Sequence, residues 1–310
     1  MNSKQFSRSI LMVLFATLVI YSCKKDRFEE EEKDTYSSMD DFYNENKQEE
    51  QVFLIDSGDT AGPIIGKEGT KLYVGKDLFM YSSGADIDWP YTIKLIELYP
   101  IKDMLFYEQP TIGSGTILES AAEIRVRAFK GTDELVLKPG KAYYMELDSM
   151  ASLETSMEVY YGFTNGSILD WSNDLTSINS SITTDSLSSV TTGTDFYTMT
   201  VAQMDWVDCA KAYSSSNPNT TIAFTAEGNG TEFIDIFISF KDVKSLMQVY
   251  SMTSGNIPTG TNVTVVAMAK NQDNAYVVHN EDIIMTSGRT IALDMQVTTE
   301  SALLTILDGL

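Results

Sequence analysis

The sequence predicts a mainly β protein with two consecutive antiparallel β-sandwich domains and a short C-terminal helix. Three observations lead to this class. Residues that favour strands, such as Thr, Val, Ile, Tyr and Phe, dominate the chain, whereas runs that favour helices are few. Many short segments alternate apolar and polar side chains, and Gly or Pro separates them. The 310 residues are 43% hydrophobic, which is enough to bury two modest cores.

The first 22 residues have the features of a secretory signal. Lys4 and Arg8 precede an apolar run that extends from Ile10 to Ile20. The run is much shorter than the roughly 20 residues that a membrane-spanning helix needs. The segment Ile20-Tyr21-Ser22-Cys23 resembles a bacterial lipobox, and the resemblance implies that Cys23 receives lipid and becomes the first residue of the mature chain.

The chain contains two cysteines, Cys23 and Cys209. A chance cysteine at the end of the signal, or a disulfide between the two, are the alternatives to lipidation. One acyl chain holds a protein to a membrane only reversibly, whereas two chains hold it stably. We therefore expect an outer-membrane protein that contacts the membrane through lipid on Cys23, with Cys209 as a buried apolar side chain.

Residues 23–56 are predicted to be a disordered acidic tether. Acidic residues outnumber basic ones there, and no apolar periodicity is evident. A solvated linker is one interpretation. The other is a sorting label, because the run Glu29-Glu30-Glu31-Glu32 resembles the export signal of surface lipoproteins in the Bacteroidota. The two interpretations differ in whether the protein faces the cell surface or the periplasm.

Residues 57–148 form the first predicted sandwich. Its expected strands alternate clearly and are separated by turns at Gly131-Thr132 and Pro139-Gly140. These strands lie at residues 70–74, 91–98, 123–129, 134–137 and 142–147.

A resemblance covers most of the folded chain. It is carried by Gly69-Thr70-Lys71-Leu72, residues 93–98, Gln109-Pro110-Thr111, Leu118-Glu119-Ser120 and residues 137–141. These segments are similar to a group of uncharacterised Bacteroidota outer-membrane lipoproteins whose first domain is a ZU5-like β-sandwich. The chain has Ala121-Ala122 where that group usually has paired glycines. The resemblance implies a fold and a compartment, and it implies no reaction.

Residues 157–310 form the second predicted sandwich, interrupted by a Ser/Thr-rich loop at residues 172–195. Met204 to Cys209 resembles the signature Gly-Trp-Ile-Asn-Cys-Asp of the same lipoprotein group, with Asp205 and Asp208 in place of its Gly and Asn. A helical turn is expected at residues 242–248, and Thr299 is expected to cap a C-terminal helix. Further strands are predicted at residues 157–162, 196–201, 220–225, 233–240, 262–269, 275–278 and 290–297.

Charge and motif content limit the function classes. The net charge of −22 disfavours nucleic acid as a partner, because binding its backbone requires a basic patch. His279 is the only histidine and is expected in an exposed turn, so a Ser-His-Asp or Cys-His site is improbable. One histidine and one free cysteine also disfavour zinc. We therefore predict no catalytic residues, no metal and no cofactor.

Two weaker possibilities stay open. Asp86 and Asp88, or Asp205 and Asp208, offer oxygen ligands for calcium, although solvated turn residues are the commoner meaning of such pairs. Paired carboxylates can also hydrolyse glycosidic bonds, but 44 acidic residues make chance pairs common.

Aromatic residues suggest where a ligand would bind. Trp89 precedes Pro90 in a predicted turn and Trp171 borders the Ser/Thr loop, so both are candidates for an exposed binding surface, whereas Trp206 is expected in the core. The expected function is a non-enzymatic binding, adhesion or structural role in the envelope, with envelope proteins or glycans as partners. The alternative is a carbohydrate-binding or carbohydrate-processing accessory lipoprotein.

Overall fold

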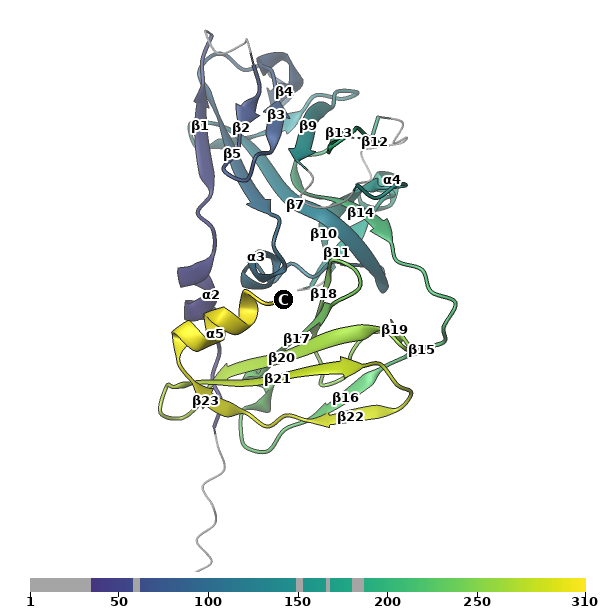
Figure 1. The fold of residues 1–310 in the computed structure, drawn as a ribbon. Coiled ribbons are helices and arrows are strands. Elements are labelled where there is room, and N and C mark those ends of the chain that lie inside the picture. Colours follow the sequence, from purple (N-terminus) through teal and green to yellow (C-terminus); the bar gives the residue numbers. More distant parts are fainter. Residues whose placement is uncertain (1–34, 58–61, 149–152, 166–167, 180–186) are drawn as a thin grey trace, which may run out of the picture. The chain divides into compact units, whose positions relative to one another are not determined.

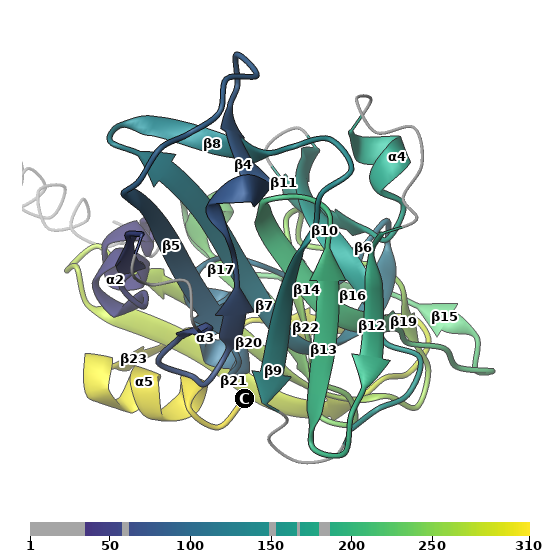
Figure 2. The ribbon, with the colours of Figure 1, turned by 90° about the horizontal axis from the view of Figure 1, so that it is seen from above.

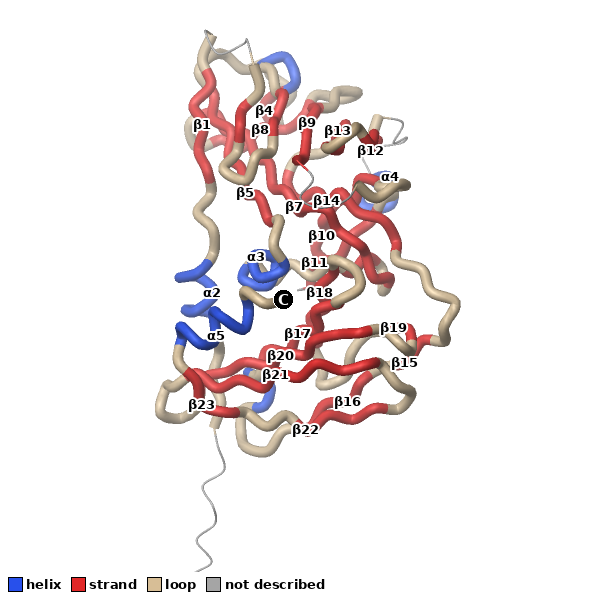
Figure 3. Tube along the Cα trace, in the orientation of Figure 1, coloured by secondary structure: helices blue, strands red, loops and turns tan. Residues whose placement is uncertain are grey.

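A computed structural model describes residues 35–57, 62–148, 153–165, 168–179 and 187–310, which belong to one compact unit from Thr35 to Leu310. The predicted signal sequence, Cys23 and the first part of the predicted tether lie outside the described residues. Strands dominate the structure and helices are few (Figure 3), so the predicted mainly β class is confirmed.

The largest sheet has nine strands, six of which follow one another across it (Figure 1). Every pairing within it is antiparallel, as predicted. In order these six are β1 (Gln51–Ile55), β5 (Tyr91–Leu98), β7 (Thr116–Lys130), β14 (Asp205–Ala212), β10 (Glu158–Asn165) and β11 (Ile168–Ser172). Three short strands complete the sheet: β6 (Ile112–Gly113) and β8 (Asp133–Leu137) pair with the two ends of β7, and β4 (Phe79–Tyr81) pairs with β8.

A five-stranded sheet covers one face of this sheet and completes a sandwich (Figure 2). In order it contains β12 (Ser189–Thr192), β13 (Phe196–Val201), β9 (Tyr143–Asp148), β3 (Lys71–Tyr73) and β2 (Ile64–Ile65). The apolar alternation read from the sequence places Ile93 and Leu95 of β5 in the core between the sheets, where they meet Met145 of β9 and Met199 of β13. Burial of these alternating side chains fixes which face of each strand points inward.

The C-terminal sheet consists of β18 (Ser245–Val249), β17 (Asp235–Phe240), β20 (Asn262–Lys270), β21 (Tyr276–Ile284) and β23 (Gln296–Thr298). Both faces of its central strands β17 and β20 are buried. One face packs under β16 (Ile222–Thr225) and β22 (Arg289–Ala292), which pair in parallel, and the short pair β15 (Asn219–Thr220) and β19 (Ile257–Pro258) adjoins them. The other face contributes Phe237, Val266 and Met268 to a core shared with the nine-stranded sheet and the helices.

Helices fill the space between the sandwich and the C-terminal sheet (Figure 1). They are α2 (Asp40–Asn46), α3 (Ile101–Phe106) and α5 (Glu300–Leu307), whereas α4 (Leu175–Ile178) lies by the sandwich. Two single 3₁₀ turns, η2 (Lys76–Leu78) and η3 (Thr231–Phe233), complete the described elements. The predicted C-terminal helix is confirmed, and the hydroxyl of Thr299 accepts the backbone N–H of Ala302 as a cap.

The prediction of a disordered tether is wrong from Thr35 onward. Met39, Phe42 and Tyr43 have the i, i+3, i+4 spacing of a helical stripe, and all three are buried in α2 or at its start. Asp40 and Asp41 face solvent on the same helix. These acidic residues therefore belong to a short amphipathic helix. The strand that follows, β1, is an edge strand of the nine-stranded sheet.

The predicted domain boundary at residues 148–157 differs from the observed pairing. Strands from both sides of it share sheets, since β9 pairs with β13 and β7 pairs with β14. Periodicity identifies a strand but not its partner, which explains the difference. The predicted Ser/Thr loop 172–195 contains α4 and β12 among its described residues, and the helical turn expected at residues 242–248 is a turn followed by β18.

Candidate functional site

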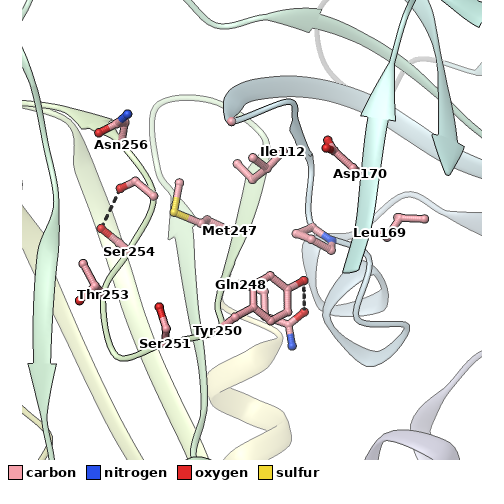
Figure 4. Close-up of a pocket in the computed structure, with 13 residues that line it drawn as sticks. Ile112, Leu169, Asp170, Met247, Gln248, Tyr250, Ser251, Thr253, Ser254 and Asn256 are labelled. Carbon is pink, nitrogen blue, oxygen red and sulfur yellow. Dashed lines mark hydrogen bonds between the residues drawn. The ribbon is translucent and has the colours of Figure 1, made fainter. Parts of the chain in front are cut away.

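A groove lies beside β18, where the nine-stranded sheet and the C-terminal sheet meet. Its main hollow has a volume of about 470 Å³, within the range of small-molecule sites. A second hollow of about 390 Å³ adjoins it and shares Gln248, Tyr250 and Ser251. We call the two hollows together the Tyr250 groove. The main hollow is lined by Pro110, Ile112, Gly115, Leu169, Asp170, Met247, Gln248, Tyr250, Ser251, Thr253, Ser254, Gly255 and Asn256 (Figure 4).

One wall is the loop that follows β18. The backbone of Met252 accepts a hydrogen bond from Phe224, and Ser254 donates its N–H to Ile222, so the loop is paired with β16. The buried hydroxyl of Ser254 accepts the N–H of Ile222 at 2.8 Å and donates to the carbonyl of Gly255 at 2.8 Å. These bonds fix the conformation of the loop, although the residues at its tip are exposed.

The opposite wall is formed by Pro110, β6 and β11. The side chain of Asp170 accepts the backbone N–H groups of Ser114 at 2.6 Å and Trp171 at 2.8 Å. The indole Nε1 of Trp171 donates to the carbonyl of Pro110 at 2.8 Å. Trp171 thereby joins β11 to the segment that leads into β6.

The two walls are joined at their base by Thr111. Its backbone N–H donates to the carbonyl of Leu246 at 2.9 Å, and its hydroxyl accepts the N–H of Leu246 at 2.8 Å. The same hydroxyl lies 2.7 Å from the hydroxyl of Ser245. All three residues are buried, so the base of the groove is a fixed polar seam.

The ring of Tyr250 is the main aromatic surface of the groove. Its side chain is 52% exposed, and its hydroxyl donates to Oε1 of Gln248 at 3.0 Å (Figure 4). This bond orients both side chains and leaves the amide nitrogen of Gln248 as a donor. Ser251, Thr253 and Asn256 are exposed and line the same hollow. The groove therefore offers a stacking surface with hydroxyl and amide groups next to it.

A second polar cluster is buried on the face of the nine-stranded sheet that points away from the sandwich core, next to the turn before β18. Glu123 of β7 and Asp208 of β14 are register partners, and both are fully buried. Asp208 accepts a hydrogen bond from Ser120 at 2.6 Å, whereas its Oδ2 and both carboxyl oxygens of Glu123 have no partner among the described residues. Lys244, in the turn before β18, donates to the carbonyl of Ala121.

Burial dominates the electrostatics of this buried carboxyl pair. Desolvation raises the pKa of Asp208 to about 7, although Ser120 and Lys244 oppose the rise. Desolvation and the charge of Asp208 raise the pKa of Glu123 as well. Desolvation lowers the pKa of Lys244 to about 8. Neither carboxyl is exposed, so the pair cannot touch a polymer, and we interpret it as part of the packing between the sheets.

A third buried carboxylate shapes a turn. Oε1 of Glu97 accepts the backbone N–H of Thr70 at 3.0 Å, and Oε2 accepts Nε2 of Gln51 at 2.7 Å. The N–H of Glu68 also donates to Oε2, at 3.2 Å. A Cβ on Gly66 would lie 2.2 Å from Oε2, so any side chain at that position would displace the carboxylate. Glu97 therefore anchors the turn between β2 and β3.

The two tryptophans predicted on a binding surface are less exposed than the sequence suggested. Trp171 is 1% exposed, which contradicts its predicted place on a binding surface, because its indole fills the space beneath the groove wall. Trp89 is partly buried, with its ring 5.3 Å from that of Tyr91 and the ammonium of Lys76 6.0 Å away. Trp206 is buried, as expected.

The other candidate residues are dispersed. His279 lies within β21 rather than in an exposed turn, and its Nδ1 accepts the N–H of Asp294 at 3.2 Å. Asp86 pairs with Lys138 at 2.5 Å and Asp88 approaches Lys76 at 4.0 Å, so these two carboxylates point to different cations. Among the residues that the structure describes, no three His, Cys, Asp or Glu side chains are grouped to hold a metal.

Sequence reasoning missed Tyr250 and Gln248. The signal that was present is the polar run from Ser251 to Asn256 between a strand and Pro258, which is typical of an exposed loop. The packing that places this loop opposite β11 is not visible in the sequence. None of the described helices has the length and apolar content to span a membrane. Comparisons of the chain with protein-family models, with curated proteins and with solved structures found no match.

Proposed function

We propose that this chain is a lipid-anchored protein of the outer membrane whose role is to bind an envelope component in the Tyr250 groove. The groove carries the proposal, because it combines a half-exposed aromatic ring with hydroxyl and amide groups on walls that are fixed by hydrogen bonds. The role is non-enzymatic in this proposal. The enclosure of Glu123 and Asp208 keeps this particular carboxyl pair out of contact with any ligand in the groove.

The anchor in this proposal is lipid on Cys23, on the strength of the lipobox-like segment that ends there. Metabolic labelling with palmitate tests it. The unchanged protein is expected to incorporate label and to sediment with membranes, and the Cys23→Ser form is expected to lose both properties. Equal membrane retention of the two forms would remove the anchor from the proposal.

The binding role is tested by photo-crosslinking in the cells that make the protein. A benzoylphenylalanine at position 250 is expected to form adducts with an envelope component. The same residue at position 144 is the matched control, because Tyr144 is 53% exposed but lies on β9 in the five-stranded sheet of the sandwich and does not line the groove. Adducts at neither position, or equal adducts at both, would contradict a ligand in the groove.

A further inference from the structure

The ligand class of the Tyr250 groove can be narrowed by its chemistry, and this step rests on the function proposed above. The first constraint is charge. No lysine, arginine or histidine is present among the described residues that line the two hollows, whereas Asp170, Glu232 and Asp235 contribute carboxyl groups. The whole chain carries a net charge of −22. Phosphorylated, sulfated or uronic acid ligands would be repelled there, so the charge of the groove disfavours anionic ligands.

The second constraint is the mixture of surfaces. The Tyr250 ring presents an apolar face of the kind that packs against the C–H face of a sugar ring. The amide of Gln248 is held next to the ring by the Tyr250 hydroxyl, and the exposed Thr253 and Asn256 add donors and acceptors elsewhere in the main hollow. A sugar hydroxyl both donates and accepts, so a row of hydroxyls can pair with such a set. An aliphatic ligand would leave these polar groups without partners.

The third constraint is length. Tyr250 lies where the two hollows meet, with about 470 Å³ on one side and about 390 Å³ on the other. The two hollows share Gln248, Tyr250 and Ser251, so a ligand of several units can contact both. A single monosaccharide would occupy only part of the groove.

From these constraints we propose that the Tyr250 groove binds an uncharged oligosaccharide, with one sugar ring stacked on Tyr250 and its neighbours hydrogen-bonded to Gln248 and Asn256. On the opposite wall, the carboxylate of Asp170 is held in place by two backbone N–H groups and accepts hydrogen bonds from hydroxyl groups of the sugar. The chain binds the sugar without cleaving it.

The test is calorimetric titration of the full-length protein. The lipid-anchored protein is kept in solution with a polyoxyethylene detergent. A maltoside detergent is avoided, because its sugar headgroup would compete with the probes for the groove. The probes are cellotetraose, xylotetraose and mannotetraose, with tetragalacturonate as the charged counterpart. At least one neutral tetrasaccharide is expected to bind with a Kd below about 1 mM. Tetragalacturonate is expected not to bind.

Two variants locate the site. Tyr250→Ala is expected to weaken binding about tenfold or more, equivalent to a loss of about 1.4 kcal/mol. Tyr144→Ala, which removes an equally exposed ring from the sandwich, is expected to leave affinity unchanged. Equal affinity of Tyr250→Ala and the unchanged protein would overturn the proposal, and so would tighter binding of tetragalacturonate than of the neutral sugars. Circular dichroism of both variants verifies that they fold.

The outcome separates this inference from the function on which it rests. If all three neutral sugars fail to bind at about 10 mM while crosslinks form at position 250, the ligand class is wrong and the binding role stands. If position 250 also gives no crosslinks, the groove is not the binding site.

Discussion

Replacement of Asp208 by Asn should flatten the dependence of stability on pH. Burial raises the pKa of Asp208 from its ordinary value of 3.8 to about 7. The folded protein therefore holds this proton more tightly than the unfolded chain does. Between about pH 4 and 7 the folded state binds more protons, so the free energy of unfolding falls as pH rises. Above about pH 7 the full cost of the buried charge is present.

The magnitude follows from the two pKa values. At about 1.4 kcal/mol per pKa unit, the difference between 3.8 and about 7 corresponds to about 4 kcal/mol. About 2 to 3 kcal/mol of this should be lost between pH 5 and pH 8. The lowered pKa of Lys244 acts in the opposite direction, but only above about pH 8. The Asn side chain keeps the oxygen that accepts the hydrogen bond from Ser120. Its amide nitrogen takes the position of Oδ2, which has no partner among the described residues.

Urea unfolding at about pH 5 and about pH 8 measures the effect. The decline in unfolding free energy should be smaller in Asp208→Asn than in the unchanged protein by about 2 kcal/mol. Asp205→Asn is the matched control, since Asp205 is exposed on the same strand and pairs with Arg125. An undiminished decline in Asp208→Asn, or the same change in Asp205→Asn, would refute the assignment of this pH dependence to Asp208.

Three more predictions concern single side chains. Gly66→Ala should lower the unfolding free energy by about 2 to 4 kcal/mol, because the added methyl group displaces the carboxylate of Glu97 and leaves backbone N–H groups unpaired. The control is Gly62→Ala, whose methyl group meets nothing within 4 Å and should change the unfolding free energy little. Urea unfolding of the two variants distinguishes them. Trp171→Ala should cost about 3 to 5 kcal/mol as a cavity in the core, so a lower melting temperature, rather than lost binding at an unchanged melting temperature, is its expected signature. The thiol of Cys209 should react with Ellman's reagent only after unfolding, since burial raises its pKa, and a fast reaction in the native protein would contradict this burial.

Much of the fold was predictable because its strands alternate. Residues 91–98 and 196–201 were placed at their observed bounds, and the C-terminal helix was predicted from its cap. The edge strand β1 was missed, because its neighbours are acidic and composition outweighed the short apolar pattern. A wider reading of residues 39–43 at helical spacing would have found α2.

The candidate site was less predictable, because it depends on pairing between distant segments. Trp171 looks like a loop residue in the sequence, but its register opposite Gly162 and its bond to Pro110 bury it. Tyr250 follows a strand by one residue and becomes part of a wall only because Thr111 binds β18. Local patterns contain no information about the bond from Trp171 to Pro110 or from Leu246 to Thr111, each of which joins residues more than 60 positions apart.

The way the chain enters the fold has a mechanical consequence. Ser37 exchanges two backbone hydrogen bonds with Lys270 of β20, and Thr35 forms a bridge with Asn229. Next comes α2, whose Phe42 and Tyr43 are wedged among the rings of Phe106, Tyr276 and Phe237. A pulling force applied to the chain N-terminal to Thr35 would therefore act on the C-terminal sheet before it acts on any strand of the sandwich. The strand β18, which lines the groove, belongs to that sheet.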